Sequence, residues 1–309
     1  MKLEIATEKY LTALSVEGKS TNTIEFYRSN LTVFVRWLGK AELEEVQASD
    51  VRCYLHYLQT EHIPYGAGHP LHQPARHLAP HSIKGHWATL SAFFRWAEGE
   101  GMLKDNPMLR IPRPKVPKKI KAGLTEQEVR GLLKACETKG GRRAARDHAI
   151  LLFLLDTGCR VSELCDIELA DLDAASGRVK VRGKGAKERF VYIGQTTRRA
   201  MLKYLDKHRL RTADTHLFLT HDGRKLGRYG VASMLSRLGD RAKVPGVHAH
   251  RFRHTAAVQL LRNGSDIFHL QRMLGHSTLD MVKAYLALAD ADVARAHQRA
   301  SPVENWGLR

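Results

Sequence analysis

Residues 149–164 read AILLFLLDTGCRVSEL, and this stretch indicates how the second part of the chain folds. The apolar residues at its start predict a buried helix over residues 146–156. Gly158 interrupts that helix, and a new helix is expected to begin near Arg160. A guanidinium at a helix start lies beside unpaired backbone N–H groups and suits a phosphate. Glu163, one turn later, can hold Arg160 from behind, although an exposed surface pair explains the same spacing.

The residues that follow change from helical to strand periodicity. Val179 and Val181 alternate with polar residues, the sequence GKGAK at 183–187 predicts a turn, and residues 190–193 return the chain. This pattern predicts a β-hairpin with Lys184 at its tip, where a lysine is usually a solvated charge but can also reach into a DNA groove. Further helices are expected at residues 125–136, 196–210, 229–242, 250–262, 266–274 and 277–288.

The first part of the chain predicts a small helical module. Apolar residues recur with helical spacing over residues 4–16, 22–38, 50–59 and 82–100. Residues 62–86 hold six histidines, and the part before residue 81 is also rich in Pro and Gly. Their spacing matches no standard metal-ligand pattern, so we expect a surface loop over residues 62–80 rather than a metal site.

The positive charge lies in the second part of the chain. A net charge of +18 and a pI near 9.9 favour a polyanionic partner. The first 110 residues hold 12 Lys and Arg and 12 Asp and Glu, so the remainder carries the whole excess. Residues 110–121 hold six cations, three prolines and no acid, which predicts a linker that can lie along phosphates. The expected organisation is a helical domain at residues 1–110, a basic linker at 111–122 and a second domain at 123–309.

The composition and the residue pattern also indicate the cellular compartment of the protein. The longest apolar run is too short to cross a bilayer, and polar residues interrupt the first helix where a signal peptide would be apolar. The four cysteines form no C-x-x-C pair and are expected to be reduced thiols. We therefore expect a cytoplasmic protein that does not bind a membrane.

A second cluster of cations and proton-transfer groups lies at residues 250–254, which read HRFRH. His250 and Arg253 are one helical turn apart and reach the same face, and His254 shares it. Each histidine taken alone could be a buried core residue. The three histidines that include His248 could suggest a metal site, but the acid of an H-E-x-x-H motif is missing.

The combination of these groups is more specific than any one of them. Residues 157–164 (TGCRVSEL), 183–185 (GKG), 250–254 (HRFRH), 274–277 (LGHS) and Tyr285 resemble the tyrosine recombinase (phage integrase) family in residue type, order and spacing. Residues 20–24 (STNTI) and 93–97 (FFRWA) are similar to that family's helical, SAM-like core-binding domain. The resemblance implies a mainly α fold, the DNA breaking-rejoining enzyme fold. Its α-rich catalytic domain carries a small antiparallel β-sheet, and the two domains close on DNA as a C-shaped clamp.

The resemblance also implies site-specific DNA recombination without a metal or other cofactor, through six catalytic residues: Arg160, Lys184, His250, Arg253, His276 and Tyr285. Tyr285 would attack the scissile phosphate and form a 3′-phosphotyrosyl link. His250 would act as general base, and Lys184 would protonate the 5′-oxygen. Arg160 and Arg253 would clamp the nonbridging oxygens, with His276 as a further donor. Glu163 and His254 are expected to support these catalytic side chains without contacting the phosphate themselves.

The implied substrate is a double-stranded DNA recombination site. Strands would be exchanged through a Holliday junction by a homotetramer, or a heterotetramer with a related recombinase, bound to two sites. The free protein would be a monomer or dimer. Candidate DNA contacts are the cations of the fourth helix and the linker: Lys84, Arg95, Arg113, Lys115, Lys118, Lys119 and Lys121.

Three other classes of function fit parts of the pattern. A type IB topoisomerase uses similar chemistry without pairing two sites. A metal-dependent nuclease would need clustered carboxylates, and Asp166, Glu168, Asp171 and Asp173 form the one grouping in the sequence. We expect those four acids to face water in the turn before the hairpin. A DNA-binding regulator with a decayed site is disfavoured because every catalytic position is filled.

Overall fold

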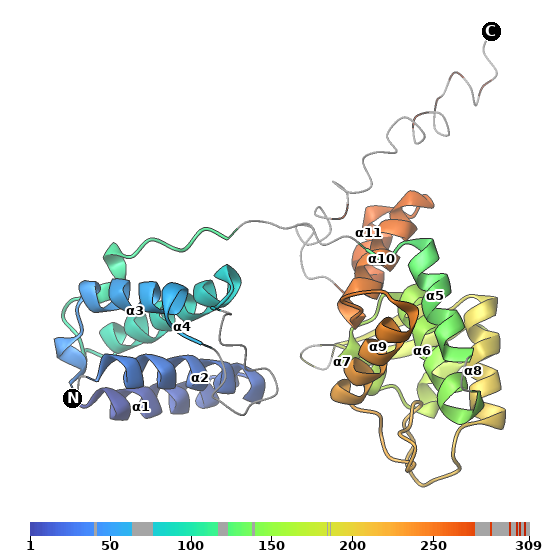
Figure 1. The fold of residues 1–309 in the computed structure, drawn as a ribbon, viewed down its shortest axis with the longest axis horizontal. Helices are drawn as coiled ribbons and strands as arrows, with labels where there is room; N and C mark the ends of the chain where they lie inside the picture. The colour runs from blue at the N-terminus through green and yellow to red at the C-terminus, as the bar shows by residue number, and fades with distance from the viewer. Residues whose placement is uncertain are drawn as a thin grey trace. The chain divides into compact units, whose positions relative to one another are not determined.

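The chain folds mainly into helices, and its residues divide into two compact units, Met1–Lys119 and Ile120–Arg309 (Figure 1). The computed structural model describes residues 1–39, 42–63, 77–116, 123–137, 140–183, 185, 187–275, 285, 297, 301, 303 and 306. Both units have an apolar core of their own. The mainly α fold with a small antiparallel sheet, predicted from the sequence, is confirmed.

The first unit is built from helices on which apolar side chains recur every three or four residues. Its elements are α1 (Leu3–Val16), α2 (Thr21–Leu38), the 3₁₀ turn η1 (Leu43–Glu45), α3 (Ala48–Thr60), α4 (Pro80–Gly99) and the 3₁₀ turn η2 (Pro107–Arg110). The Ser20 side chain caps α2 by accepting from the N–H of Thr23, and Gly39 ends that helix with a positive φ. The four helices predicted for this region are confirmed.

The described part of this unit's core is rich in aromatic residues and includes a buried histidine. Phe34, Tyr54 and Phe93 are fully buried. His86 on α4 is also buried, and its Nδ1 shares a hydrogen bond of 2.9 Å with the hydroxyl of Tyr54. His86 thus lies in the helix predicted over residues 82–100, but its burial was not predicted from the sequence. Residues 64–76 of the expected surface loop lie outside the described residues.

The second unit surrounds a long central helix. Its helices are α5 (Glu126–Glu137), α6 (Gly141–Thr157), α7 (Val161–Cys165), α8 (Gln195–Lys207), α9 (Arg228–Ala242), α10 (Ala249–Arg262) and α11 (Ile267–Leu274), with the 3₁₀ turn η3 (Leu169–Asp171) after α7. A capping box marks the start of α5, because Thr125 and Glu128 each accept from the other's backbone N–H. The expected helix at residues 277–288 lies outside the described residues, apart from Tyr285.

Helix α6 lies in the core and ends beside the candidate site. It begins at Gly141 rather than near residue 146, because its first turn is polar and the apolar pattern starts later. Ile150, Phe153 and Leu154 are fully buried. Gly158 follows α6 with φ of 59°, and a Cβ there would lie 2.8 Å from the Leu274 side chain and 3.2 Å from Ala256. Glycine is needed here for both its backbone angle and its small size.

The sheet is three-stranded and antiparallel, in the order β1 (Leu172–Asp173), β2 (Arg178–Arg182) and β3 (Glu188–Tyr192). The predicted β2–β3 hairpin is confirmed, with Val179 paired to Val191 and Val181 to Arg189. The Gly183 N–H donates to the Lys187 carbonyl and closes the turn. Lys184 itself lies outside the described residues.

Candidate active site

The beginning of α7 holds Arg160 in a fixed orientation. Arg160 is the N-cap residue, with φ of −72° and ψ of 150°. Its N–H donates to Glu163 Oε2 over 2.8 Å, and its Nη1 donates to Oε1 over 2.9 Å. Its guanidinium also donates to the carbonyls of Leu274, at 3.5 Å, and Gly275, at 3.2 Å. The Arg160 side chain is 37% exposed, so the guanidinium remains accessible to a ligand.

A second arginine, Arg189 on strand β3, binds the same Glu163 carboxylate. Arg189 Nη1 and Nη2 each donate to one oxygen of Glu163 over 2.8 Å, and its Nε donates to the Met273 carbonyl over 2.9 Å. Burial raises the pKa of the Glu163 carboxyl, but the hydrogen bonds from Arg189 and Arg160 outweigh burial and leave that pKa below its ordinary value. Glu163 is therefore ionised between two cations.

Arg189 was not among the site residues predicted from the sequence. The available signal is its place in strand β3, where it shares the inward face with the buried Val191 and pairs with the buried Val181. An arginine at an inward strand position needs a partner.

Arg253 on α10 is almost fully buried beside Arg160. Its Nη1 donates to the Gly158 carbonyl and its Nη2 to the Leu274 carbonyl, both over 2.8 Å. Burial, with a smaller contribution from the nearby charge of Arg160, lowers its pKa to about 10, although Glu163 and Tyr285 act in the opposite direction. The Arg253 guanidinium remains charged at neutral pH. An anion bound beside it, in addition to Glu163, would offset part of the free-energy cost of burying that charge.

The hydroxyl-bearing Tyr285 joins this group from the C-terminal side. Its side chain is buried and packs in a small apolar cluster with Ala257, Leu270 and Leu274. The Tyr285 and His254 rings lie 5.2 Å apart between centroids. Tyr285 is also close enough to Arg253 to influence the pKa of that guanidinium. The structure thus brings Arg160, Arg253 and Tyr285 together.

The histidines of α10 have different surroundings. His250, in the first turn, is exposed, and His254 is partly buried. Burial lowers the pKa of His254, and His250 lowers it further. His248 is the N-cap of α10 and accepts from the N–H of Arg251 over 3.2 Å. The face shared by His250, Arg253 and His254 is the one expected from their spacing, while Phe252 on the other side is fully buried.

Several predicted residues lie outside the described part of the chain. They are the catalytic candidates Lys184 and His276 and the linker cations Lys118, Lys119 and Lys121.

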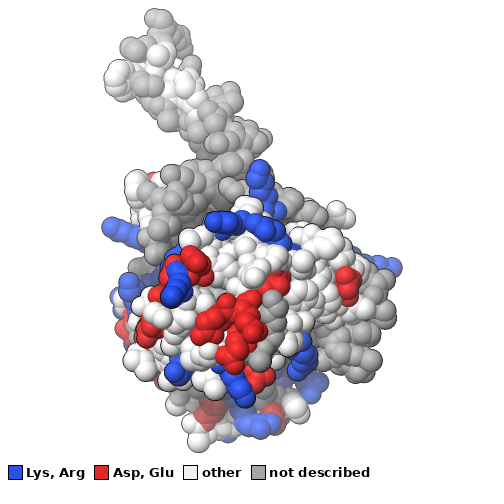
Figure 2. Space-filling model, turned by 90° about the vertical axis from the view of Figure 1, so that its left-hand side faces the viewer, with Lys and Arg blue, Asp and Glu red and all other residues white. Residues whose placement is uncertain are grey.

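The other candidate DNA contacts lie in the first unit. Arg95 and Lys115 are exposed, Lys84 is half-buried, and the Arg113 guanidinium lies 6.0 Å from the centre of the Trp87 ring. On the face of the molecule that Figure 2 shows, acidic side chains gather near the centre and basic side chains are scattered around them. That face is not a continuous basic surface, in keeping with the neutral composition of the first 110 residues.

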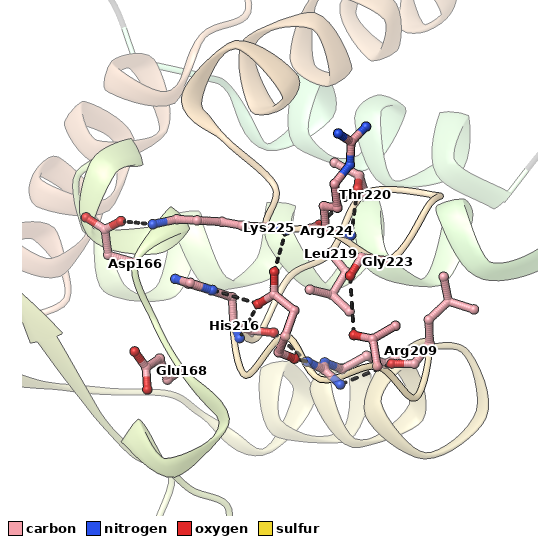
Figure 3. A network of polar contacts seen from close by, with 12 residues as sticks. Asp166, Glu168, Arg209, His216, Leu219, Thr220, Gly223, Arg224 and Lys225 are labelled. Atoms are coloured by element: carbon pink, nitrogen blue, oxygen red, sulfur yellow. Dashed lines mark hydrogen bonds and ion pairs between the residues drawn. The ribbon is translucent and has the colours of Figure 1, made fainter.

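The four acids before the hairpin have separate partners. Asp166 accepts from Lys225 Nζ over 2.5 Å, within the polar network of Figure 3 that holds the chain between α8 and α9. Asp173 accepts from Ser176, and Glu168 and Asp171 form a capping box around η3. Among the described residues, no three His, Cys, Asp or Glu side chains are grouped as a metal site requires.

The expectation that these acids face water is wrong for Asp171. This carboxylate is buried and lies 3.2 Å from Arg182 and 3.5 Å from Lys180. The three buried cysteines and the exposed Cys53 are free thiols.

No described helix combines the length and the apolar character that spanning a bilayer requires.

Comparison with known proteins places the chain in a family. A model described as "Phage integrase family" matches residues 123–292, and one described as "Phage integrase, N-terminal SAM-like domain" matches residues 7–102. The tyrosine recombinase XerC of Oceanobacillus iheyensis is 31% identical and covers 98% of each chain. The XerC of Bacillus pumilus is 32% identical over 96% of this chain and 92% of its own length.

Solved structures share the fold. A lambda integrase dimer bound to a COC′ core site has a TM-score of 0.73 at 20% identity and covers 92% of this chain and 95% of that chain. The XerH site-specific recombinase in a post-cleavage complex with a palindromic difH substrate has a TM-score of 0.70 at 18% identity. It covers 96% of this chain and 84% of that chain. The family resemblance noted in the sequence is thereby confirmed, and the chain belongs to the phage integrase family of tyrosine recombinases.

Proposed function

We propose that this protein is a site-specific DNA recombinase in which the phenolic oxygen of Tyr285 attacks the scissile phosphodiester. The new bond joins Tyr285 Oη to phosphorus, and the bond from phosphorus to the 5′-oxygen breaks. The products are a 3′-phosphotyrosyl link and a free 5′-hydroxyl. Because the phosphoester bond is exchanged rather than hydrolysed, rejoining is the same step reversed and needs no ATP.

The observation that carries this proposal is the convergence of Arg160 and Arg253 on the Leu274 carbonyl, with Tyr285 beside Arg253. Two cations held this close repel each other, and one of them is buried. An anionic phosphate between them would relieve that repulsion, and the relief would be largest in the transition state, where charge builds on the nonbridging oxygens. Both guanidinium groups are already fixed by backbone carbonyls, so little reorganisation is required.

We assign the remaining roles to residues of the family pattern. His250, exposed on the face of α10 that carries Arg253, is the general base that accepts the phenolic proton. Lys184, between β2 and β3, protonates the departing 5′-oxygen, and His276 is a further donor to the phosphate. Glu163 fixes Arg160, and His254 supports Tyr285 through ring packing.

The proposed substrate is a double-stranded DNA recombination site. The XerC relatives are tyrosine recombinases, and the chain matches them over almost its whole length. We infer a homotetramer, or a heterotetramer with a related recombinase, that exchanges strands through a Holliday junction on two sites in the cytoplasm. We propose that the two domains clamp DNA and that the basic linker and cations of the first domain contact phosphates, which makes binding strongly salt-dependent.

A nicked suicide substrate tests the cleavage step. Such a duplex, drawn from the DNA that flanks the gene, loses a short strand after attack and traps the covalent complex. The wild-type chain is expected to give a complex that survives detergent, with and without EDTA. Tyr285→Phe is expected to bind the same DNA but give none, and an equal yield from this variant would refute the assignment.

A second assay separates recombination from supercoil relaxation. Two labelled sites on separate duplexes are expected to give strand-exchange products. Relaxation of a plasmid by a monomer, with no exchange between paired sites, would instead identify a type IB topoisomerase.

A further inference from the structure

Arg189 uses all three nitrogens of its guanidinium to join three elements of the second unit. It stands on β3, its Nη1 and Nη2 bind both oxygens of Glu163 on α7, and its Nε binds the carbonyl of Met273 on α11. The side chain is only 15% exposed. A paired two-oxygen contact of this kind fixes orientation as well as distance, and lysine cannot reproduce it.

The Glu163 carboxylate is shared between Arg189 and Arg160. Oxygen Oε1 accepts from both guanidinium groups, and Oε2 accepts from Arg189 and from the Arg160 N–H. One negative charge therefore faces two positive charges. Without Arg189, Arg160 would be the one charged group left among these contacts of the buried Glu163 carboxylate. The negative charge of Glu163 would then offset the positive charge of Arg160. With Arg189 in place, the positive charge of Arg160 is available to a phosphate.

The turn after α11 is shaped to admit Arg189. Gly275 has φ of +65°, and a Cβ there would lie 3.0 Å from Arg189 Nη1 and 3.1 Å from Cζ and Nε. The same turn supplies the Leu274 and Gly275 carbonyls that bind Arg160. Arg189 thus contacts both the carboxylate and the backbone turn that orient Arg160.

We propose that Arg189 is a positioning residue for strand cleavage, which acts through Glu163 and the turn at Met273–Gly275 to keep the Arg160 guanidinium oriented and its positive charge available to the scissile phosphate. This inference rests on the proposed function. It assigns to Arg189 no contact with DNA.

Three nicked substrates identify the group through which Arg189 acts. The first has an ordinary scissile phosphate. The second has a methylphosphonate, which carries no negative charge and needs less help from Arg160. The third has a 5′-bridging sulfur, whose leaving group needs no proton. Arg189→Gln is expected to cleave the first about 100-fold more slowly than wild type. The deficit should shrink to a few-fold on the methylphosphonate and persist on the sulfur substrate.

Two variants control for folding and for loss of charge. Arg178→Gln removes an arginine of the same sheet, whose Cζ lies 4.7 Å from the centre of the Phe190 ring and which does not pair with Glu163. This variant should cleave at the wild-type rate. Arg189→Gln/Glu163→Gln leaves no unpaired buried charge, so it should recover thermal stability lost in Arg189→Gln without recovering the cleavage rate. If Arg189→Gln does not fold, this double variant takes its place in the three-substrate comparison.

The outcomes separate the inference from the function beneath it. Wild-type rates for Arg189→Gln on the ordinary phosphate, or an equal deficit on all three substrates, would overturn the positioning role. Rescue by the sulfur substrate alone would also overturn it, because Arg189 would then act through the leaving group. Absence of a covalent complex with the wild-type chain would overturn the proposed function itself.

Discussion

Arg160 and Arg253 donate to the same backbone oxygen, the carbonyl of Leu274, at 3.5 Å and 2.8 Å. Arg160 caps the start of α7 and Arg253 lies on α10, so the end of α11 holds together two cations from separate parts of the fold. This relationship is the physical basis of the phosphate clamp that we propose.

Arg253→Lys should slow cleavage by about 100-fold or more while leaving DNA binding nearly unchanged. A single ammonium cannot bind the Gly158 and Leu274 carbonyls and also face a phosphate in the way a guanidinium can. The measurement is the single-turnover rate of covalent complex formation on a nicked substrate. Arg251→Lys is the matched control, since Arg251 lies on the same helix but pairs with Glu128 at 2.7 Å. Equal losses in the two variants would contradict a specific role for Arg253.

Gly158→Ala should lower the free energy of unfolding by about 2–3 kcal/mol. Its positive φ and the 2.8 Å approach of Leu274 both oppose a Cβ. Gly131→Ala, in the interior of α5, is the control, because its Cβ would meet Ala242 at an ordinary 3.8 Å and alanine favours the helix. Urea unfolding of both variants checks this. A Gly158→Ala chain as stable as wild type would show that the turn after α6 can relax.

The first unit should lose stability between pH 7.5 and pH 5. Burial lowers the pKa of His86 to about 4, with a smaller effect from His62, whereas an unfolded histidine titrates near 6.5. The unfolded chain therefore binds more protons in this window. The contribution of neutral His86 is complete above pH 6.5 and is lost as the pH falls toward 4. The expected loss at pH 5 is about 2 kcal/mol.

Tryptophan fluorescence reports this transition, because Trp37, Trp87 and Trp96 lie in the first unit. Urea midpoints at the two pH values give the change in stability. His86→Gln should show a smaller difference between the two pH values. A His86→Gln chain with the full wild-type pH dependence would mean that another group is responsible.

One thiol should react quickly with Ellman's reagent in the native protein, and four should react in denaturant. Cys53 is exposed, whereas burial raises the pKa of Cys136 and Cys159 to about 12 and that of Cys165 to about 11. Cys53→Ser should abolish the fast reaction without changing cleavage. Rapid native labelling of Cys159, located by peptide mapping, would show that the turn before Arg160 opens in solution.

The sequence predicted the helices and the hairpin because each depends on local spacing. It also placed Arg160 at a helix start and put His250 and Arg253 on one face. It did not predict the role of Arg189, whose partners Glu163 and Met273 are far away in the chain and meet it only through the register of β3. The buried positions of His86 and Asp171 were missed for the same reason. Polar residues in a polar stretch indicate a surface unless the partners that compensate for burial are known.

The most direct test of the account is to identify the residue that becomes bonded to DNA. The covalent complex from a nicked substrate is digested with protease and nuclease, and the modified peptide is sequenced by mass spectrometry. The account predicts a single nucleotide 3′-phosphate on Tyr285. A nucleotide on any other residue, or cleavage without a covalent adduct, would contradict it.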